Sequence, residues 1–370
     1  MTMVAEGRGR EREGRRPFIA EVDWLMLSVL CLCCLGLIMA VSIQGPAAGP
    51  LSAMKGQATK LLFGLFAFLV AAILPLAYLR HYVRPLFVAA VVMCFAAALI
   101  FSPVNGASRW IHLGSVHFQP VEVARFLLVF YCAAVIADRG NRVHGFRDGF
   151  VPIMGASALL AGGLLLQPDL GNAVFVLALS AAIALAGGVR YVHFALVGAP
   201  IMLGLGLFVS GHGYVRERIT GFLHAEPGGQ VSQGLVAISS GGLTGRGLGE
   251  GWMKMGFVPE AGNDFVFAII GEEFGLLGSV FVMVSFATIG FVGLRLVLKL
   301  RDPFYRLLVF GMTFAICMQA AINLLVVTGM APAKGIDLPF ISSGGTNLVF
   351  SLAAVGIIGN AARADRVARR

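Results

Sequence analysis

Long apolar runs alternate with short polar segments along the whole chain. A helix needs about 20 apolar residues to cross the roughly 30 Å hydrocarbon core of a bilayer. The apolar runs here have about that length, and they lack the alternating ten-residue pattern of barrel strands. We predict about ten spans. They lie at residues 24–43, 58–78, 85–102, 119–137, 150–167, 170–188, 191–210, 265–293, 307–329 and 346–362.

This pattern predicts an all-α fold, a polytopic transmembrane helix bundle, because backbone groups in lipid must find their hydrogen-bond partners within the protein. Of the 370 residues, 58% are hydrophobic and 13% are charged, which excludes an ordinary soluble fold. We expect one transmembrane domain at residues 23–363. Basic cytoplasmic tails, 1–22 and 364–370, flank it.

The net charge of +9 comes from short arginine clusters between apolar runs, not from one basic face. This distribution favours topology signals over a nucleic-acid partner. If the N-terminus is cytoplasmic, most of the 28 lysines and arginines face the cytoplasm. We therefore predict a multi-pass membrane protein with both termini in the cytoplasm. The first apolar run is too long for the core of a signal peptide, so we interpret it as an uncleaved helix.

Metal and nucleotide chemistry find little support in the sequence. All six cysteines lie within apolar runs, where we expect free thiols, and the histidines lack the spacing of metal ligands. We therefore predict no metal site of ordinary type, and a divalent cation remains an open possibility. Ser342 and Ser343 lack the GxSxG context of a hydrolase nucleophile, and no phosphate-binding glycine loop follows a strand.

One loop, Gly211 to Asp264, is too long to be a simple connector. It retains apolar residues among its glycines, so we expect a partly folded element that lies along the membrane. Three polar segments, this loop among them, fall on the outer face in the predicted topology. Their side chains are therefore able to converge on one cavity. The segments are Asn105–Pro120, Tyr214–Glu273 and Thr328–Asn347.

Asp264 stands at the start of a predicted helix and has two interpretations. As a helix N-cap its carboxylate would accept backbone N–H groups, a stabilisation of about 1 kcal/mol. As a general base at the membrane surface it would have a pKa moved toward neutrality by apolar neighbours.

Arg109, Lys254 and Lys334 are cations of the outer segments. Each by itself is typical of an interfacial anchor whose charged end reaches water. Together they would make a clamp for an anionic headgroup such as a diphosphate. Gly344, with Gly345, would allow the backbone to approach a phosphate at the start of the last span.

Several polar residues fall at membrane depth, where such residues are functional candidates. Glu122 and Arg125 lie one helical turn apart and are able to neutralise each other, so a structural role comes first for them. Glu272, beside Glu273 in the eighth span, has no cation nearby in sequence, which favours a role in the site. Gln319 and Asn323 lie one turn apart in the ninth span.

Four stretches resemble the SEDS family of bacterial cell-wall proteins, which FtsW and RodA typify. Their order and spacing cover most of the chain. They are SRWIHLGSVHFQPVEVAR at Ser108–Arg125, QPDLGNA at Gln167–Ala173, VPEAGNDFVFAIIGEEFGLLG at Val258–Gly278 and GIDLPFISSGG at Gly335–Gly345.

The resemblance implies an inverting peptidoglycan glycosyltransferase of the bacterial cytoplasmic (inner) membrane. It would polymerise lipid II, an undecaprenyl-diphosphate-linked disaccharide peptide, at the outer face of that membrane. It also implies a class B penicillin-binding transpeptidase as partner. The family's essential aspartate matches Asp264, which favours the general base over the cap. Other matching positions are implied to handle substrate (Arg109, Lys254, Glu260, Lys334, Ser342, Ser343 and Gly344) or to serve structure and coupling (Glu122, Arg125, Gln167 and Glu272).

The chain departs from the family pattern at two places. The usual PEAHTDF reads PEAGNDF, with Gly262 and Asn263, and the usual ISYGG reads ISSGG, with Ser343. The IIGEE at Ile269–Glu273 is more similar to the division branch of the family, typified by FtsW. Two other functions remain open from the sequence: a lipid II flippase, and a scaffold without catalysis that recruits the transpeptidase.

Overall fold

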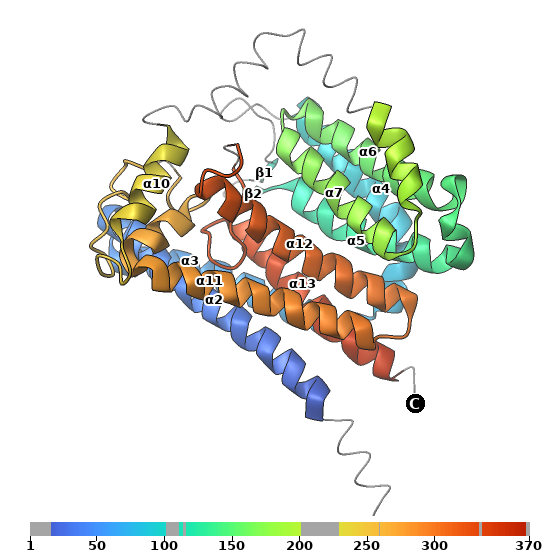
Figure 1. Ribbon diagram of the computed structural model, residues 1–370, viewed down its shortest axis with the longest axis horizontal. Coiled ribbons are helices and arrows are strands. Elements are labelled where there is room, and N and C mark those ends of the chain that lie inside the picture. The colour runs from blue at the N-terminus through green and yellow to red at the C-terminus, as the bar shows by residue number, and fades with distance from the viewer. Residues whose placement is uncertain are drawn as a thin grey trace, which may run out of the picture.

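The structure, a computed structural model, is a bundle of long helices (Figure 1). It describes residues 16–100, 111–113, 116–200, 229–258, 260–332 and 335–367. Within these ranges eight helical segments are long and apolar enough to cross a membrane. The helices in them are α2 (Arg16–Ala48), α3 (Pro50–Ile73), α4 (Leu76–Ile100), α5 (Pro120–Arg139), α6 (Val151–Leu166), α11 (Val266–Lys299), α12 (Pro303–Val327) and α13 (Gly345–Val367).

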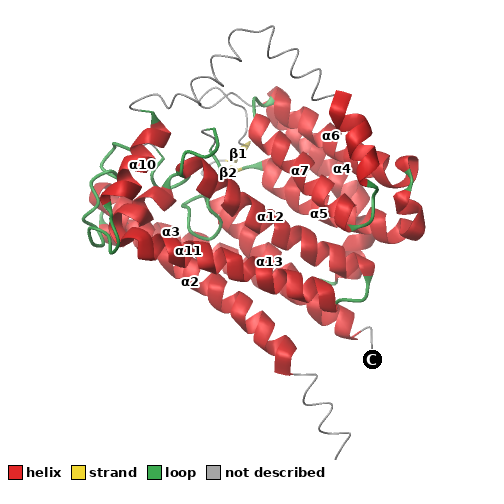
Figure 2. Cartoon of the chain, in the orientation of Figure 1, coloured by secondary structure: helices red, strands yellow, loops and turns green. Residues whose placement is uncertain are grey.

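Two further apolar helices are shorter in the described residues, α7 (Leu170–Ala186) and the helix Tyr191–Pro200. A 3₁₀ segment (Gly140–His144) and a π segment (Phe146–Phe150) join α5 to α6. Each predicted span overlaps one of these apolar helices, so the predicted all-α bundle is confirmed (Figure 2).

Two elements were not foreseen as regular structure. A small antiparallel hairpin, β1 (Ile111–Leu113) and β2 (Val116–Phe118), precedes α5. Within the long outer loop, α10 (Gln230–Ser240) packs against α11, so the described part of this loop is folded.

Helices α3 and α13 pack closely against each other, and two glycines make that approach possible. A Cβ on Gly356 would meet the Phe68 carbonyl oxygen at 2.5 Å, and one on Gly64 would meet Leu352 Cδ1 at 2.5 Å. Small residues at such crossings let two backbones pack closely in a membrane, where no hydrophobic force drives helices together. Asn360 then joins the pair by donating to the Ala71 and Leu74 carbonyls.

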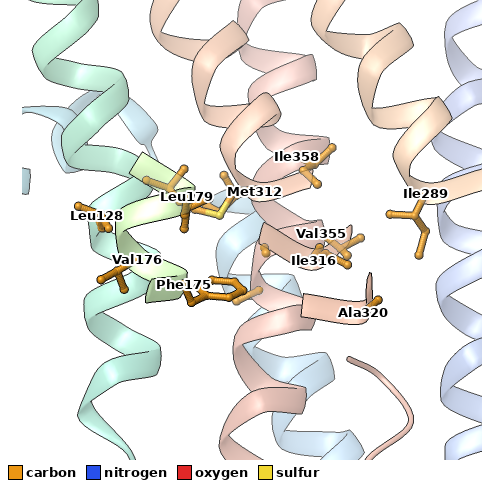
Figure 3. Packing of buried hydrophobic residues seen from close by; sticks show 14 of the residues in the cluster. Leu128, Phe175, Val176, Leu179, Ile289, Met312, Ile316, Ala320, Val355 and Ile358 are labelled. Carbon is orange, nitrogen blue, oxygen red and sulfur yellow. The ribbon is translucent and has the colours of Figure 1, made fainter. Parts of the chain in front are cut away.

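Buried apolar side chains fill the space between the packed helices. α12 packs against α5, α7, α11 and α13, while α2 packs against α3 and α11. Figure 3 shows buried side chains from four of these helices facing one another: Leu128 of α5, Phe175 of α7, Ile316 of α12 and Val355 and Ile358 of α13.

Helix α11 is broken near its start. Gly275 has φ 65° and ψ −155°, a conformation that only glycine adopts readily. The segment Gly241–Val258, which we call the strap, crosses this break. Four backbone hydrogen bonds join them: Arg246 N to Glu272 O (2.9 Å), Gly247 N to Glu273 O (3.1 Å), Leu276 N to Gly242 O (2.9 Å) and Leu277 N to Leu243 O (3.2 Å).

Candidate active site

The site lies at the end of the bundle away from the start of α2 and the end of α13. Lys299, at the end of α11, pairs with Glu21 near the start of α2 at 2.7 Å. Asp365, near the end of α13, accepts the Arg301 and Asp302 amides that precede α12. The start of α11, the end of α12 and the start of α13 therefore meet at the opposite end, and Asp264 lies there.

Asp264 is half-buried between two chain segments. Its backbone carbonyl accepts the side-chain amide of Asn323 at 2.7 Å, and the same amide donates to the Ile336 carbonyl at 2.6 Å. A Cβ on Gly335 would lie 2.7 Å from Asp264 Oδ2. The carboxylate of Asp264 therefore lies against Gly335, at the start of the Gly335–Gly345 segment.

The N-cap interpretation of Asp264 is wrong in the structure. Helix α11 begins at Val266, its N-cap is Phe265, and the cap makes no side-chain hydrogen bond. Asp264 precedes the cap by one residue and does not occupy the capping position.

Ser342 and Ser343 connect the Gly335–Gly345 segment to the loop before Asp264. Ser342 Oγ donates to the Asn263 carbonyl at 2.6 Å and accepts the Leu338 amide at 2.7 Å. The Ser343 amide donates to the Gly262 carbonyl at 2.9 Å. The two departures from the family pattern therefore lie against each other.

Two further polar groups surround Ser343. Gln44 of α2 donates from Nε2 to Ser343 Oγ at 2.9 Å, and Lys60 of α3 donates to the Ser343 carbonyl at 2.8 Å. No role in the site was predicted for Lys60. The structure places it beside Gly345, where a Cβ would touch its side-chain carbons at 3.5 Å or more.

Asp337 is a carboxylate of the site that the sequence analysis did not single out. It lies so close to Gly344 that a Cβ there would overlap its Oδ2. The pKa of the Asp337 carboxyl is raised to about 6. Burial and the charges of Glu122 and Glu260 raise it, while a hydrogen bond with Asn347 and the charge of Arg125 lower it. The sequence feature that could have identified Asp337 is its position as an acidic residue within the glycine-rich Gly335–Gly345 segment.

Glu122 and Arg125 form the predicted ion pair and are both buried. The guanidinium stacks over Phe175 at 4.8 Å and lies 3.5 Å from Gln319 Oε1. Gln319 in turn donates to the Asp337 carbonyl at 2.9 Å. The pair at membrane depth is thus joined to the site at the end of the bundle.

The predicted cations divide into two groups. Arg109 and Lys334 lie outside the described residues. Lys254 has a buried ammonium that contacts Glu273 Oε1 at 2.6 Å, so its charge is neutralised by a carboxylate. Glu260 is exposed, has φ 52°, and accepts Asn263 Nδ2 at 2.7 Å on its carboxylate.

Glu272 and Gln167 both bind backbone groups. Glu272 is buried and its carboxylate accepts the Trp252 amide at 2.8 Å and the Met253 amide at 3.2 Å. Gln167, at the end of α6, donates to the Cys94 carbonyl of α4 at 2.6 Å. Among the described residues no group of three or more histidines, cysteines or carboxylates is placed to hold a metal ion.

An apolar groove of about 560 Å³ lies beside Lys254, between α2, α3 and the strap. Its walls are mostly aliphatic, and Ser42 and Lys254 contribute its polar atoms. The lining residues are Leu37, Ile38, Val41, Ser42, Gly45, Pro46, Pro50, Met54, Leu248, Gly249 and Lys254.

Curated relatives match nearly the whole chain. The "Probable peptidoglycan glycosyltransferase FtsW" of Geobacter metallireducens is 34% identical over 351 residues, 91% of this chain and 93% of that protein. "Stage V sporulation protein E" of Bacillus subtilis is 34% identical over 269 residues, 71% of this chain and 73% of that protein.

Solved structures agree on the fold. RodA, the rod shape determining protein of Thermus thermophilus, superposes with a TM-score of 0.67 at 27% identity, over 92% of this chain and 95% of that one. A chain from "Structural coordination of polymerization and crosslinking by a peptidoglycan synthase complex" gives 0.79 at 26% identity, over 92% and 97%. A family profile described as "Cell cycle protein" matches residues 23–367, and the chain therefore belongs to the FtsW/RodA/SpoVE family of membrane proteins.

Proposed function

We propose that this chain is a peptidoglycan glycosyltransferase that polymerises lipid II at the outer face of the cytoplasmic membrane. One observation carries the proposal: Asp264 is held at the end of the bundle opposite the chain ends, with its carboxylate against the Gly335–Gly345 segment. The names of the curated relatives support the same activity. The fold supports a membrane-bound enzyme with a lipid-linked substrate.

In this proposal Asp264 is the general base. It takes the proton from a sugar 4-hydroxyl while that oxygen attacks the anomeric carbon of the diphosphate-linked chain, and the diphosphate leaves. A direct displacement inverts the anomeric centre. Arg109 and Lys334 are proposed to stabilise the charge that develops on the diphosphate, and Glu260, Ser342, Ser343 and Gly344 to shape the headgroup site.

The lipid tail fits the same arrangement. A polyprenyl chain stays in the hydrocarbon while its headgroup reaches the site, so an apolar path must reach the outer end of the bundle. The groove between α2, α3 and the strap offers such a surface close to the loop that leads to Asp264. We propose that the tail lies there.

The proposed partner is a class B penicillin-binding transpeptidase. The structure described as a peptidoglycan synthase complex, with "polymerization and crosslinking" in its description, supports this proposal by its similarity to the chain. The IIGEE stretch supports a role in division, with shape maintenance as the other setting.

Glycan-strand formation from labelled lipid II tests the function. Purified protein with its candidate transpeptidase is compared with Asp264→Ala and with Asp23→Ala, a control carboxylate that is exposed at the other end of the bundle. We expect Asp264→Ala to lose about 100-fold or more of the rate, the usual contribution of a general base, and the control to keep it.

The outcomes separate the remaining functions. Equal polymer from the wild type and Asp264→Ala would remove Asp264 as the base. If neither makes polymer, movement of labelled lipid II across vesicles would favour a flippase. Recruitment of the transpeptidase without either activity would favour a scaffold.

A further inference from the structure

The strap is built to lie in the break of α11 at very short range. A Cβ on Gly275 would overlap the backbone of Gly245 and Leu243, so the strap fits there because residue 275 has no side chain. A Cβ on Gly241 would overlap the Gly271 carbonyl, and one on Gly245 would overlap the Glu273 carbonyl. Irregular backbone at membrane depth is tolerated where its polar groups are satisfied by protein, and here the strap supplies the partners.

Two adjacent glutamates of α11 hold the strap by side chains as well. Glu272 accepts strap amides at Trp252 and Met253. Glu273 accepts the ammonium of Lys254 at 2.6 Å, and the two side chains are 0% and 1% exposed. The strap residues Trp252–Lys254 are therefore held by both carboxylates.

The ammonium of Lys254 donates to three acceptors. Besides Glu273, its ammonium lies 2.7 Å from Ser42 Oγ of α2 and 2.8 Å from the Gly249 carbonyl. Ser42 Oγ also lies 2.6 Å from Glu273 Oε1. An ammonium has three N–H donors, so this environment satisfies it without a ligand.

The cluster of Lys254, Glu273 and Ser42 is linked through α2 to the Gly335–Gly345 segment. Ser42 contacts Lys254 and Glu273, and Gln44, two residues later, donates to Ser343 of the Gly335–Gly345 segment. The strap continues through Val258 into the loop that carries Asp264. The end of α2 thus touches both segments between which Asp264 is held.

We propose that Lys254 and Glu273 are positioning residues: their buried ion pair, closed by Ser42, fixes the strap in the break of α11 and thereby fixes Asp264. This inference rests on the proposed function and changes the predicted role of Lys254. Lys254 orients the loop of the catalytic aspartate and does not bind the diphosphate.

The two roles of Lys254 differ in one measurable way. Removing one partner of a buried ion pair leaves an uncompensated charge, whereas replacing both partners with neutral groups of similar size removes that penalty. A positioning pair is therefore rescued by the second substitution. A cation that binds substrate is lost in either variant, and its loss raises KM.

The test compares Lys254→Met, Glu273→Gln and the double variant, with Lys55→Met and Glu250→Gln as matched controls at exposed positions. We expect each single variant to lower kcat by about 100-fold, the effect of misplacing a catalytic group by about 1 Å, with KM within about threefold of wild type. The double variant should recover kcat to within about tenfold, and both controls should match the wild type.

Trypsin cleavage after Arg246 reports on the strap independently of activity. The Arg246 amide is bonded to Glu272, so the wild type should resist cleavage. Each single variant should be cut at least about tenfold faster, because local opening exposes the site, and the double variant should be protected again.

Two results would overturn the inference. One is a double variant as inactive as Lys254→Met with a raised KM, which returns Lys254 to the substrate. The other is trypsin resistance that stays at the wild-type level in both single variants, which removes the pair from holding the strap. If the wild type makes no polymer, the proposed function fails while the cleavage pattern still decides whether the pair holds the strap.

Discussion

At the scale of single residues, the site contains a second carboxylate whose environment differs from that of Asp264. Asp337 lies under Gly344 and faces Glu122 and Arg125 of α5, Glu260 of the outer loop and Asn347 of α13. Burial and two carboxylates outweigh the guanidinium and the amide, so its pKa is raised from an ordinary value near 3.9. The side chain retains its proton into a pH range where an exposed aspartate is ionised.

Asp337 should make stability fall as pH rises from about 4 to 6. In this window the folded state binds more protons than the unfolded state, so the free energy of unfolding decreases with pH and is constant above it. Asp337→Asn removes this dependence while keeping the shape. We expect the variant and the wild type to have nearly equal unfolding midpoints in detergent at pH 4, and the variant to be more stable by about 2–3 kcal/mol at pH 8.

Thermal unfolding at several pH values measures this difference. An unfolding midpoint of the variant that stays below that of the wild type at pH 8 would show that the ionised carboxylate stabilises the fold.

At the scale of elements, glycine positions decide how closely helices and segments approach. On α13, Gly356 and Gly359 lie one turn apart and have opposite surroundings. A Cβ at Gly356 would meet backbone and side-chain atoms of α3 within 3.2 Å, whereas one at Gly359 would meet nothing within 4 Å. The same chemical change therefore has opposite consequences at the two positions.

Gly356→Ala should destabilise the protein and Gly359→Ala should not. An added methyl group in a tight contact costs about 1–3 kcal/mol. In open space the change gains the better helix propensity of alanine, up to about 1 kcal/mol. Unfolding midpoints of both variants in the same detergent test this. Equal midpoints would mean that α3 and α13 separate easily to admit the methyl group.

At the scale of the whole molecule, charged groups gather at the end of the bundle that holds the chain ends. Arg80 and Arg84 contact Asp138 at 2.7 and 3.1 Å, and Arg139 contacts Asp148 at 2.9 Å. Exposed pairs of this kind add little stability. Their excess of positive charge instead supports the cytoplasmic orientation of that end.

Labelling of added cysteines tests the orientation. A membrane-impermeant maleimide applied to intact cells should label a cysteine replacing Glu250 in the strap, and should label one replacing Asn141 only after permeabilisation. Both positions are exposed, and the unaltered protein is the control because its six cysteines lie within the helices. The reverse pattern would place Asp264 on the cytoplasmic side and contradict the proposed reaction.

The sequence by itself determined the helix bundle and the segments that form the site. Runs of about 20 apolar residues have one stable solution in lipid, and each predicted span overlaps an apolar helix of the described residues. The motifs around Asp264, Glu272 and Gly344 were identified from local residue types. These features depend on the types of neighbouring residues along the chain, and the sequence contains that information.

Only the tertiary structure decided which groups meet. The contact of Lys254 with Glu273 needs the strap to cross the break in α11, and the third partner, Ser42, is 212 positions away from Lys254. The pKa of Asp337 is raised because the fold buries its carboxyl and brings Glu122, from α5, near enough for its charge to act on it. Such contacts depend on how helices far apart in sequence pack against one another, and hydrophobic periodicity within one helix carries no record of its neighbours.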